Sequence, residues 1–166
     1  MSTVQVRPSP RLPFPTTAPA DYADFDCTRY DTFSVRQTQF DAMSTAFRQH
    51  GGFVSGDEVS HRLRRCAKRL PSTIEHWIAC REILNVWWRD QTLMPMFQFD
   101  LENMSIRPAC AAVVDELKTV FDDWELSLWF ATPNIWLADA VPAAVITVDR
   151  FAVLQAARAD RFIARG

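Results

Sequence analysis

The stretch Phe121–Leu137, FDDWELSLWFATPNIWL, constrains the fold most, because a helix must both begin and end inside it. Asp122 and Glu125 stand three residues apart in the D-x-x-E pattern of a capping box, which predicts that the helix begins there. Pro133 disfavours helical geometry at the residue before it, so the helix must end at that point. Trp124 lies on the face of this short helix that we expect to pack inward.

The segment after the proline carries large apolar side chains without a helical period. Ile135, Trp136 and Leu137 must therefore be covered, either by the chain's own helices or by a partner. Trp129, Trp136 and one of the pair Trp87-Trp88 do not fit a single buried stripe. Because tryptophan is enriched in protein interfaces, these rings are the candidates for a surface that faces a partner.

The composition indicates a helical protein that is large enough to bury a core. The chain has 166 residues, of which 48% are apolar and 12% aromatic, and only four are glycine. This length suits one domain, or two small ones that share a core. With 18 basic and 20 acidic residues the net charge is −2, so the overall charge does not suggest a nucleic-acid partner. We predict a mainly α fold, a helical bundle with at most one short β-hairpin.

Three S-x-x-E/Q capping boxes in the N-terminal half predict three helix starts. They are Ser34 to Gln37, Ser55 to Glu58 and Ser72 to Glu75. The first helix is expected to run to about His50 and to end at Gly51-Gly52. The second and third helices are short, with a turn of about five residues between them, which is the pattern of a helix-turn-helix.

A β-hairpin is predicted after these helices. The β-branched and aromatic run Ile83–Trp88 is separated from Thr92–Met94 by the polar break Arg89–Gln91. A helix that continues through Trp88 is the competing interpretation, because Trp77 and Trp88 also fit a period of 3.6 residues. Helix, turn, helix and hairpin, in that order over residues 34–94, are typical of a small winged-helix or excisionase-like DNA-binding module.

The C-terminal half, residues 95–166, is predicted to be helical. The expected elements are a helix from Pro108 to about Val120, a short turn at Pro142, and a final helix, Arg150–Ala164, capped by Asp149. Phe97 and Phe99 are expected to join the two halves in one core. Further inward-facing positions are predicted at Cys66, Phe151, Leu154 and Phe162.

Residues 1–33 are predicted to form a disordered tail and a docking arm. Met1–Ala20 is rich in proline and cannot bury enough apolar surface to offset the entropy of ordering it. Asp21–Thr32 mixes acidic and aromatic residues and is expected to dock as an arm. The tail lacks the apolar core of a secretory signal, and no apolar stretch is long enough to span a bilayer, so we expect a soluble, cytoplasmic protein.

Two motifs in the C-terminal half resemble a known family. Pro95–Asp100 reads P-M-F-Q-F-D, and some thirty residues later Thr132–Leu137 reads T-P-N-I-W-L after the tryptophan-rich helix. In this order and spacing they resemble the toxin-binding domain of Xre/MbcA/ParS-type antitoxins. The resemblance covers residues 95–166, less than half of the chain. Where the family often has a glycine-containing turn, this chain has Ala138–Pro142, so the turn and any surface built on it can differ.

The resemblance implies an antitoxin-like protein that binds and sterically neutralises a cognate toxin, commonly a RES-domain protein that consumes NAD⁺, and that can regulate its own promoter. The implied toxin contacts are Trp129, Asn134, Trp136 and Leu137, with Arg158, Arg161 and Arg165 of the last helix as the occluding part. A stand-alone transcriptional regulator and an orphan interaction or scaffold protein are the alternatives. Helix-turn-helix proteins and antitoxins commonly dimerise, so a homodimer is expected.

Basic residues at the end of the second predicted helix are candidate DNA contacts, because cations there can bind phosphates. This cluster is Arg62, Arg64, Arg65, Lys68 and Arg69, and Thr73, His76 and Arg81 are the candidate contacts on the third helix. The third helix offers no Asn, Gln or Lys for base edges, however, and cations at a helix C-terminus also complement its dipole. A degenerate module kept as a scaffold or dimer surface is therefore the alternative.

No enzyme, metal site or cofactor is predicted. Cys27, Cys66, Cys80 and Cys110 contain no C-x-x-C pair, which disfavours zinc and favours buried thiols in a reducing cytosol. The histidines are isolated from one another and from the cysteines. With four glycines the chain has no phosphate-cradling loop, and no Ser-His-Asp order occurs.

Overall fold

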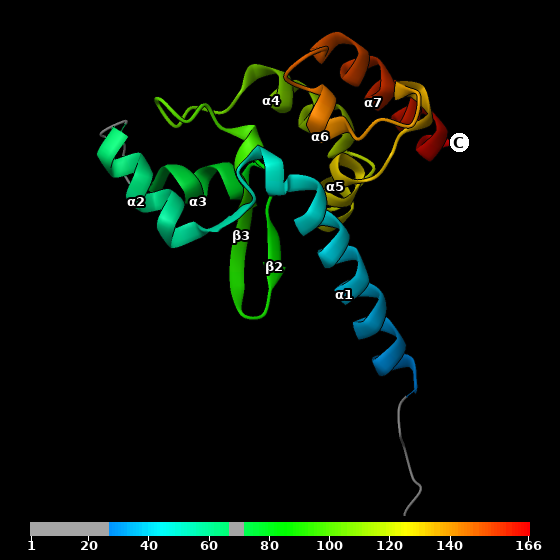
Figure 1. The fold of residues 1–166 in the computed structure, drawn as a ribbon, viewed down its shortest axis with the longest axis horizontal. Helices are drawn as coiled ribbons and strands as arrows, with labels where there is room; N and C mark the ends of the chain where they lie inside the picture. The colour runs from blue at the N-terminus through cyan, green and yellow to red at the C-terminus, as the bar shows by residue number, and fades with distance from the viewer. Residues whose placement is uncertain (1–26, 67–71) are drawn as a thin grey trace, which may run out of the picture.

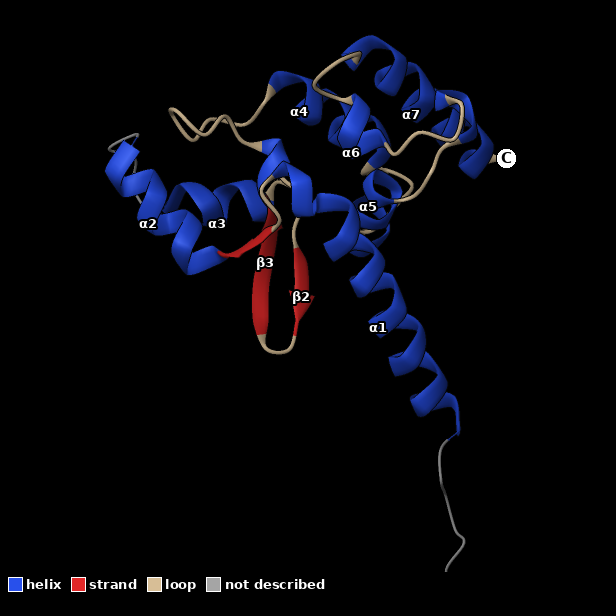
Figure 2. Ribbon diagram, viewed as in Figure 1, coloured by secondary structure: helices blue, strands red, loops and turns tan. Residues whose placement is uncertain are grey.

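The computed structural model describes residues 27–66 and 72–166. Within these ranges the protein is mainly helical and its strands are short (Figure 2). The disordered tail predicted at residues 1–20 lies outside the described residues, whereas the end of the predicted docking arm is helical. No helix in the described ranges is long and apolar enough to cross a membrane.

The N-terminal half combines helices with short strands (Figure 1). In order, its elements are α1 (Cys27–Phe47), the 3₁₀ helix η1 (Arg48–His50), β1 (Phe53–Ser55), α2 (Gly56–Cys66), α3 (Ser72–Ala79), β2 (Val86–Trp88) and β3 (Gln91–Pro95). Figure 1 shows α2 and α3 on one side of the hairpin that β2 and β3 form. The first turns of α1 extend away from the rest of the molecule.

The start of α1 differs from the sequence prediction, but its end does not. Ser34 is not a cap: it lies inside the helix, where its carbonyl accepts a hydrogen bond from the Thr38 hydroxyl at 3.0 Å. The chain has no proline or glycine in α1, so no local signal prevents the helix from beginning at Cys27. At the predicted end, Gly51 has a φ of 96° and the N–H of Gly52 bonds to the Phe47 carbonyl at 2.9 Å.

β1 is a strand that was not predicted from the sequence. β3 is the central strand, with β1 and β2 antiparallel on either side, so the described residues hold one strand more than the expected hairpin. A Cβ at Gly51 would lie 2.8 Å from the Cβ of Met96, so only glycine lets the chain pass this close to the end of β3. The carbonyl of Gly52 then accepts the Met96 N–H at 2.9 Å and begins the pairing.

The hairpin itself is present, and the competing helix is not. Trp88 pairs with Gln91, which leaves a turn of two residues, Arg89-Asp90. These residues have φ of 46° and 62°, the geometry of a type I′ turn, whose twist matches that of the two strands. The predicted break of three residues is one too long, since Gln91 belongs to β3.

Short helices make up the C-terminal half. In order, they are the 3₁₀ helix η2 (Met96–Gln98), α4 (Pro108–Leu117), α5 (Asp123–Ala131), the 3₁₀ helix η3 (Ile135–Leu137), α6 (Pro142–Val145) and α7 (Arg150–Arg165). The predicted proline start of α4 and the Asp149 cap of α7 are confirmed, the latter by a 2.9 Å bond from the Ala152 N–H. Both helix starts could be predicted from the sequence because a first-turn proline and an N-cap side chain act within one helical turn.

Among the described residues, the buried side chains form two clusters rather than the single core that was expected. The first cluster lies between α2, α3 and the sheet and comprises Val59, Leu63, Ile74, Trp77, Ile83, Met94, Met96, Phe99 and Met104. The second joins α4, α5, α6 and α7, and it also contains Met43 and Phe47 of α1. Helix α1 therefore packs with the C-terminal half through these two side chains.

The segment Met96–Phe99 contributes to both clusters. Met96 and Phe99 belong to the first, whereas Phe97 belongs to the second and lies 5.2 Å from Phe130 between ring centroids. Gln98 is 1% exposed, and its side chain bonds to backbone groups of β3 and of the segment before β2. The F-Q-F part of the motif therefore joins the two halves of the fold.

Some side chains that were predicted to face inward are exposed. Cys66, Phe151 and Phe162 are the exceptions, and the two rings are 68% and 79% exposed. The buried face of α7 is made by Val153, Ala156 and Ala157. Phe151 and Phe162, three turns apart on another face, consequently point to solvent.

Candidate functional site

Three side chains of the stretch Phe121–Leu137 converge on one carboxylate, that of Asp160 in α7. The indole N–H of Trp129 donates to Oδ2 at 2.8 Å, and the amide of Asn134 donates to the same oxygen at 2.7 Å. The indole N–H of Trp136 donates to Oδ1 at 2.9 Å. Hydrogen bonds to an ionised acceptor are stronger than neutral ones, so Asp160 fixes the positions of both rings.

Local signals bring these residues to α7. Asp122 and Glu125 form the predicted capping box, with bonds of 2.8 and 2.9 Å, and so set the start of α5. The helix ends before Pro133, as predicted. Asn134 then caps η3 by accepting the Trp136 N–H at 2.9 Å, which turns the Trp136 ring toward Asp160.

The turn after η3, Ala138–Pro142, contains no glycine. Ala138 and Asp139 have φ of 53° and 62°, in the left-handed region that favours glycine. The Asp139 N–H donates to the Asn134 carbonyl at 3.0 Å, and the Asn134 N–H donates to the Ala140 carbonyl at 3.1 Å, so the turn still closes. The turn geometry therefore forms without glycine, at a cost of about 1 kcal/mol for a residue such as Ala138.

Only part of the implied toxin-contact set is accessible. Leu137 is 9% exposed and belongs to the second cluster, and Asn134 is 8% exposed, so neither residue forms the outer surface that was expected of it. Trp129 is half-buried. Trp136 is 53% exposed, and Ile135 beside it is 78% exposed.

Two exposed apolar residues, Ile135 and Ile163, lie in the same region as Trp136. Ile163 follows Asp160 by three residues on α7, which puts it on the same side of the helix, and it is 63% exposed. Trp136 is bonded to Asp160, one helical turn before Ile163, and Ile135 precedes Trp136 in η3, so these three exposed residues, Ile135, Trp136 and Ile163, belong to one region of the molecule. We name them the Trp136 surface.

The arginines predicted as the occluding part of α7 are bonded to α4 and the residues just after it. Arg158 donates to Glu116 at 2.9 Å, and Arg161 lies 2.6 Å from the other oxygen of Glu116. Arg165 donates to the Thr119 hydroxyl at 3.1 Å. These contacts hold α7 along α4, so the three arginines lie at the junction of the two helices, where Arg158 and Arg165 remain exposed.

Of the DNA contacts predicted on α2, one is in an ion pair within the protein and two are not. Arg62 pairs with Glu58 at 2.9 Å, and this hydrogen bond lowers the pKa of the Glu58 carboxyl. Arg64 and Arg65 are exposed, and neither has a hydrogen bond or ion pair with the described part of the chain. Lys68 and Arg69 lie outside the described residues.

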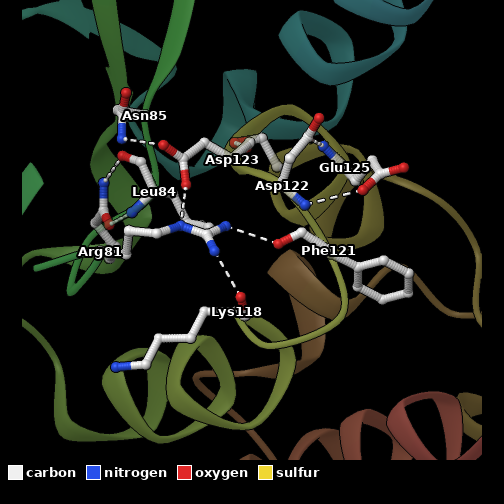
Figure 3. A network of polar contacts seen from close by, with 10 residues as sticks. Arg81, Leu84, Asn85, Lys118, Phe121, Asp122, Asp123 and Glu125 are labelled. Carbon is white, nitrogen blue, oxygen red and sulfur yellow. Dashed lines mark hydrogen bonds and ion pairs between the residues drawn. The ribbon is translucent and has the colours of Figure 1, made fainter. Parts of the chain in front are cut away.

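The DNA contacts predicted on the third helix are split between solvent and the interior, and Arg81 lies beyond the end of α3 at Ala79. Thr73 is half-buried and His76 is exposed. Arg81, by contrast, directs its guanidinium inward: Nε donates to Asp123 at 2.8 Å, and the two terminal nitrogens donate to the carbonyls of Lys118 and Phe121 at 2.5 and 2.7 Å (Figure 3). Arg81 is thus already occupied within the protein.

The Arg81 network connects the end of α3 to the loop before α5. Figure 3 shows Asp123 between Arg81 and Asn85, with the capping box of α5 alongside. The Asn85 amide donates to Asp123 at 3.3 Å. The partners are 37 to 42 residues from Arg81 in the chain, so this network joins the two clusters of the fold at a second point besides Gln98.

The thiols of this chain differ in their surroundings. Burial raises the pKa of the Cys110 thiol to about 12, an effect that the nearby Arg107 only partly opposes. A thiol with such a pKa remains protonated and is chemically inert, which makes Cys110 a packing residue. Cys66 and Cys80 are exposed, contrary to the expectation of buried thiols.

Asp160 was not predicted from the sequence. In the sequence, Asp160 lies between Arg158 and Arg161, so its pattern is that of an ordinary charged residue on a solvent-exposed helix. The only local signal is that it is the single acid of α7. Its role depends on Trp129 and Trp136, which are 31 and 24 residues away, so a local pattern could not identify it.

No protein-family model, no curated protein and no solved structure matches this chain. Its function must therefore be inferred from the residues and their geometry.

Proposed function

We propose that this chain is an antitoxin-like protein that binds a partner protein through the Trp136 surface. The observation that carries the proposal is the bond from Trp136 to Asp160, which holds a half-exposed tryptophan in one orientation. Tryptophans that are held rigidly and exposed in part are typical binding hot spots, because little side-chain entropy is lost when they bind.

The neighbours of Trp136 favour a protein partner. Ile135 and Ile163 add exposed apolar area beside the ring, and covering such area stabilises a complex. The carboxylate of Asp160 beside this surface already accepts hydrogen bonds from Trp129, Asn134 and Trp136. A partner surface that complements it is therefore apolar, with few charges of its own. This describes a protein surface better than a nucleic acid, whose phosphates the carboxylate would repel.

The identity of the partner follows from the resemblance of Pro95–Asp100 and Thr132–Leu137 to the toxin-binding domain of Xre/MbcA/ParS-type antitoxins. The proposed partner is a RES-type toxin, and neutralisation is steric. Because Arg158, Arg161 and Arg165 are engaged with α4 and the residues just after it, we assign the blocking role to the Trp136 surface instead.

Trp136→Ala is expected to weaken binding to the proposed RES-type toxin by about tenfold or more, the loss typical of a hot-spot tryptophan. The same change should lower the melting temperature little, since more than half of the ring is exposed. Titration calorimetry with the purified toxin measures the first effect, and thermal melting measures the second.

Two further tryptophan variants separate binding from folding. Trp87 on β2 is 64% exposed and lies outside the Trp136 surface, so Trp87→Ala should leave both binding and melting unchanged. Trp124 is half-buried and bonded to Gln39 at 2.7 Å, so Trp124→Ala should cost about 3 kcal/mol of stability. If Trp136→Ala melts as early as Trp124→Ala, or binds the toxin normally, the contact surface is elsewhere.

DNA binding by residues 53–95 is the second candidate, and the order of elements favours it. A strand, two helices and a hairpin follow α1, and β1 pairs with β3, which is the order and pairing of a winged helix. In this arrangement α3 is the recognition helix and Arg89-Asp90 the tip of the wing. Arg64 and Arg65 remain as phosphate contacts, and we leave Arg81 out because its guanidinium is occupied.

Replacing Arg64 and Arg65 together with alanine is expected to reduce the slope of log affinity against log salt by about 2, because two phosphate-binding cations are removed. Gel shifts with DNA from upstream of this gene, at several salt concentrations, measure the slope. The matched control is Arg48→Ala with Arg150→Ala, two exposed arginines on other elements, which should leave it unchanged. Absence of binding at low salt would exclude this surface as a DNA interface and favour a scaffold role for residues 53–95.

A further inference from the structure

Three potential metal ligands meet at the C-terminal end of α3. They are His76, Cys80 and Glu82, whose ligand atoms all lie within 4.8 Å of one another. The Cys80 sulfur lies 3.8 Å from each ring nitrogen of His76. The first two side chains are exposed and Glu82 is half-buried, so an ion can reach all three from solvent.

The backbone explains why these residues meet. The N–H of Cys80 bonds to the carbonyl of His76 at 2.9 Å, so the helical register continues to Cys80 and the two side chains share a face. Arg81 then adopts a φ of 51°, in the left-handed region. The chain turns back, and the N–H of Glu82 bonds to the Trp77 carbonyl at 2.8 Å, which brings the carboxylate to the same side.

The Arg81 network holds this turn in place. The Arg81 guanidinium is bonded to Asp123 and to two backbone carbonyls, so the residue between Cys80 and Glu82 is anchored to the other half of the fold (Figure 3). The main chain at the third ligand is consequently positioned before any ion binds. Such preorganisation raises metal affinity, because less entropy is lost on binding.

The chemistry of the three groups suits zinc. Imidazole nitrogen, thiolate sulfur and carboxylate oxygen bind Zn²⁺ at about 2.0–2.3 Å, which in a tetrahedron separates neighbouring ligand atoms by roughly 3.4–3.6 Å. The observed 3.8 Å between His76 and Cys80 needs only a small rotamer adjustment. The Glu82 carboxylate has no hydrogen bond or ion pair with the described residues, so it is available as a ligand. The negative end of the α3 dipole also favours a cation here.

We infer that His76, Cys80 and Glu82 form a Zn²⁺ site in which water fills the fourth position. The Cys80 thiol releases its proton to solvent when the metal–sulfur bond forms. The site was not predicted from the sequence because its ligands lack C-x-x-C spacing, whereas the H-x-x-x-C spacing on a helix also places two ligands on one face. This inference does not rest on toxin or DNA binding, and its test uses neither partner.

Cobalt is the probe for the test, since Co²⁺ occupies such sites and a thiolate ligand gives it a charge-transfer band in the near ultraviolet. The full-length protein, treated with a chelator and kept reduced, is titrated with Co²⁺ and then with Zn²⁺. One Co²⁺ per chain with a thiolate band, displaced by Zn²⁺, is the expected result. Cys80→Ser should abolish the band, and His76→Gln and Glu82→Gln should each weaken binding about 10-fold or more.

His61 and Cys66 provide a matched control, because they are an exposed histidine and an exposed cysteine on the neighbouring helix α2. His61→Gln and Cys66→Ser should leave the band and the affinity unchanged. Circular dichroism of each metal-free variant checks that the fold is intact, which the separate hydrophobic cluster around Ile74 and Trp77 should ensure. A band that survives Cys80→Ser, that disappears in Cys66→Ser, or that never forms overturns the inference.

Discussion

Replacing Gln98 with leucine is expected to lower the free energy of unfolding by about 3–5 kcal/mol. Leucine fits the volume, so packing changes little, but three backbone groups are left without partners. The Gln98 side chain accepts the Leu84 N–H at 2.7 Å and donates to the carbonyls of Leu84 and Pro95 at 2.9 and 3.0 Å. Each buried polar group left without a partner costs about 1–3 kcal/mol.

Urea unfolding of the two proteins, followed by tryptophan fluorescence, measures the difference. Gln91 on β3 supplies the matched control: it is exposed, so Gln91→Leu should change the free energy of unfolding by no more than about 0.5 kcal/mol. A loss of stability below about 1 kcal/mol for Gln98→Leu would mean that water replaces the missing bonds and that Gln98 does not join the two halves.

Replacing Asp160 with alanine is expected to cost about 2–4 kcal/mol of stability and also to weaken partner binding. The change removes the acceptor of three side-chain donors, and one of them, the amide of Asn134, is buried. The unpaired amide carries most of the stability cost. The freed ring of Trp136 can rotate, so the binding surface no longer has a fixed shape.

Chemical unfolding of this variant and its titration with the proposed toxin partner measure the two effects. Asp115 on α4 is the control, because its side chain is 75% exposed and pairs only with Lys118 at 2.8 Å within the described residues; Asp115→Ala should cost less than about 1 kcal/mol and leave binding unchanged. The decreases in binding from Asp160→Ala and Trp136→Ala should not add in the double variant, since both remove the same fixed ring. Fully additive decreases would show that Asp160 does not act through Trp136.

Two side chains, Gln98 and Arg81, connect the two hydrophobic clusters of the described residues. Gln98 joins them through the backbone at Leu84 and Pro95, and Arg81 joins them through the loop before α5. Both residues had other interpretations from sequence: Gln98 belonged to a family-like motif and Arg81 was a DNA contact. A side chain with several hydrogen-bonding groups can satisfy either role, and only its neighbours decide between them.

The sequence by itself determined the features that depend on residues within about one helical turn of each other. The capping box of Asp122 and Glu125, the Asp149 cap and the glycine end of α1 were all predicted, because each depends on groups three to five residues apart. The hairpin was also predicted, from the strand-like runs on either side of a short polar break, although the break was one residue longer than the observed two-residue turn.

Only the tertiary structure decided how these elements meet. The pairing of β1 with β3 joins residues about forty positions apart, and the start of α1 was free to extend because no local signal opposed it. The burial of Leu137, the exposure of Phe162 and the three bonds to Asp160 depend on how α7 packs against η3 and α4. Periodicity in a sequence tells which residues share a face, but not which element covers that face, because that depends on the packing of all the others.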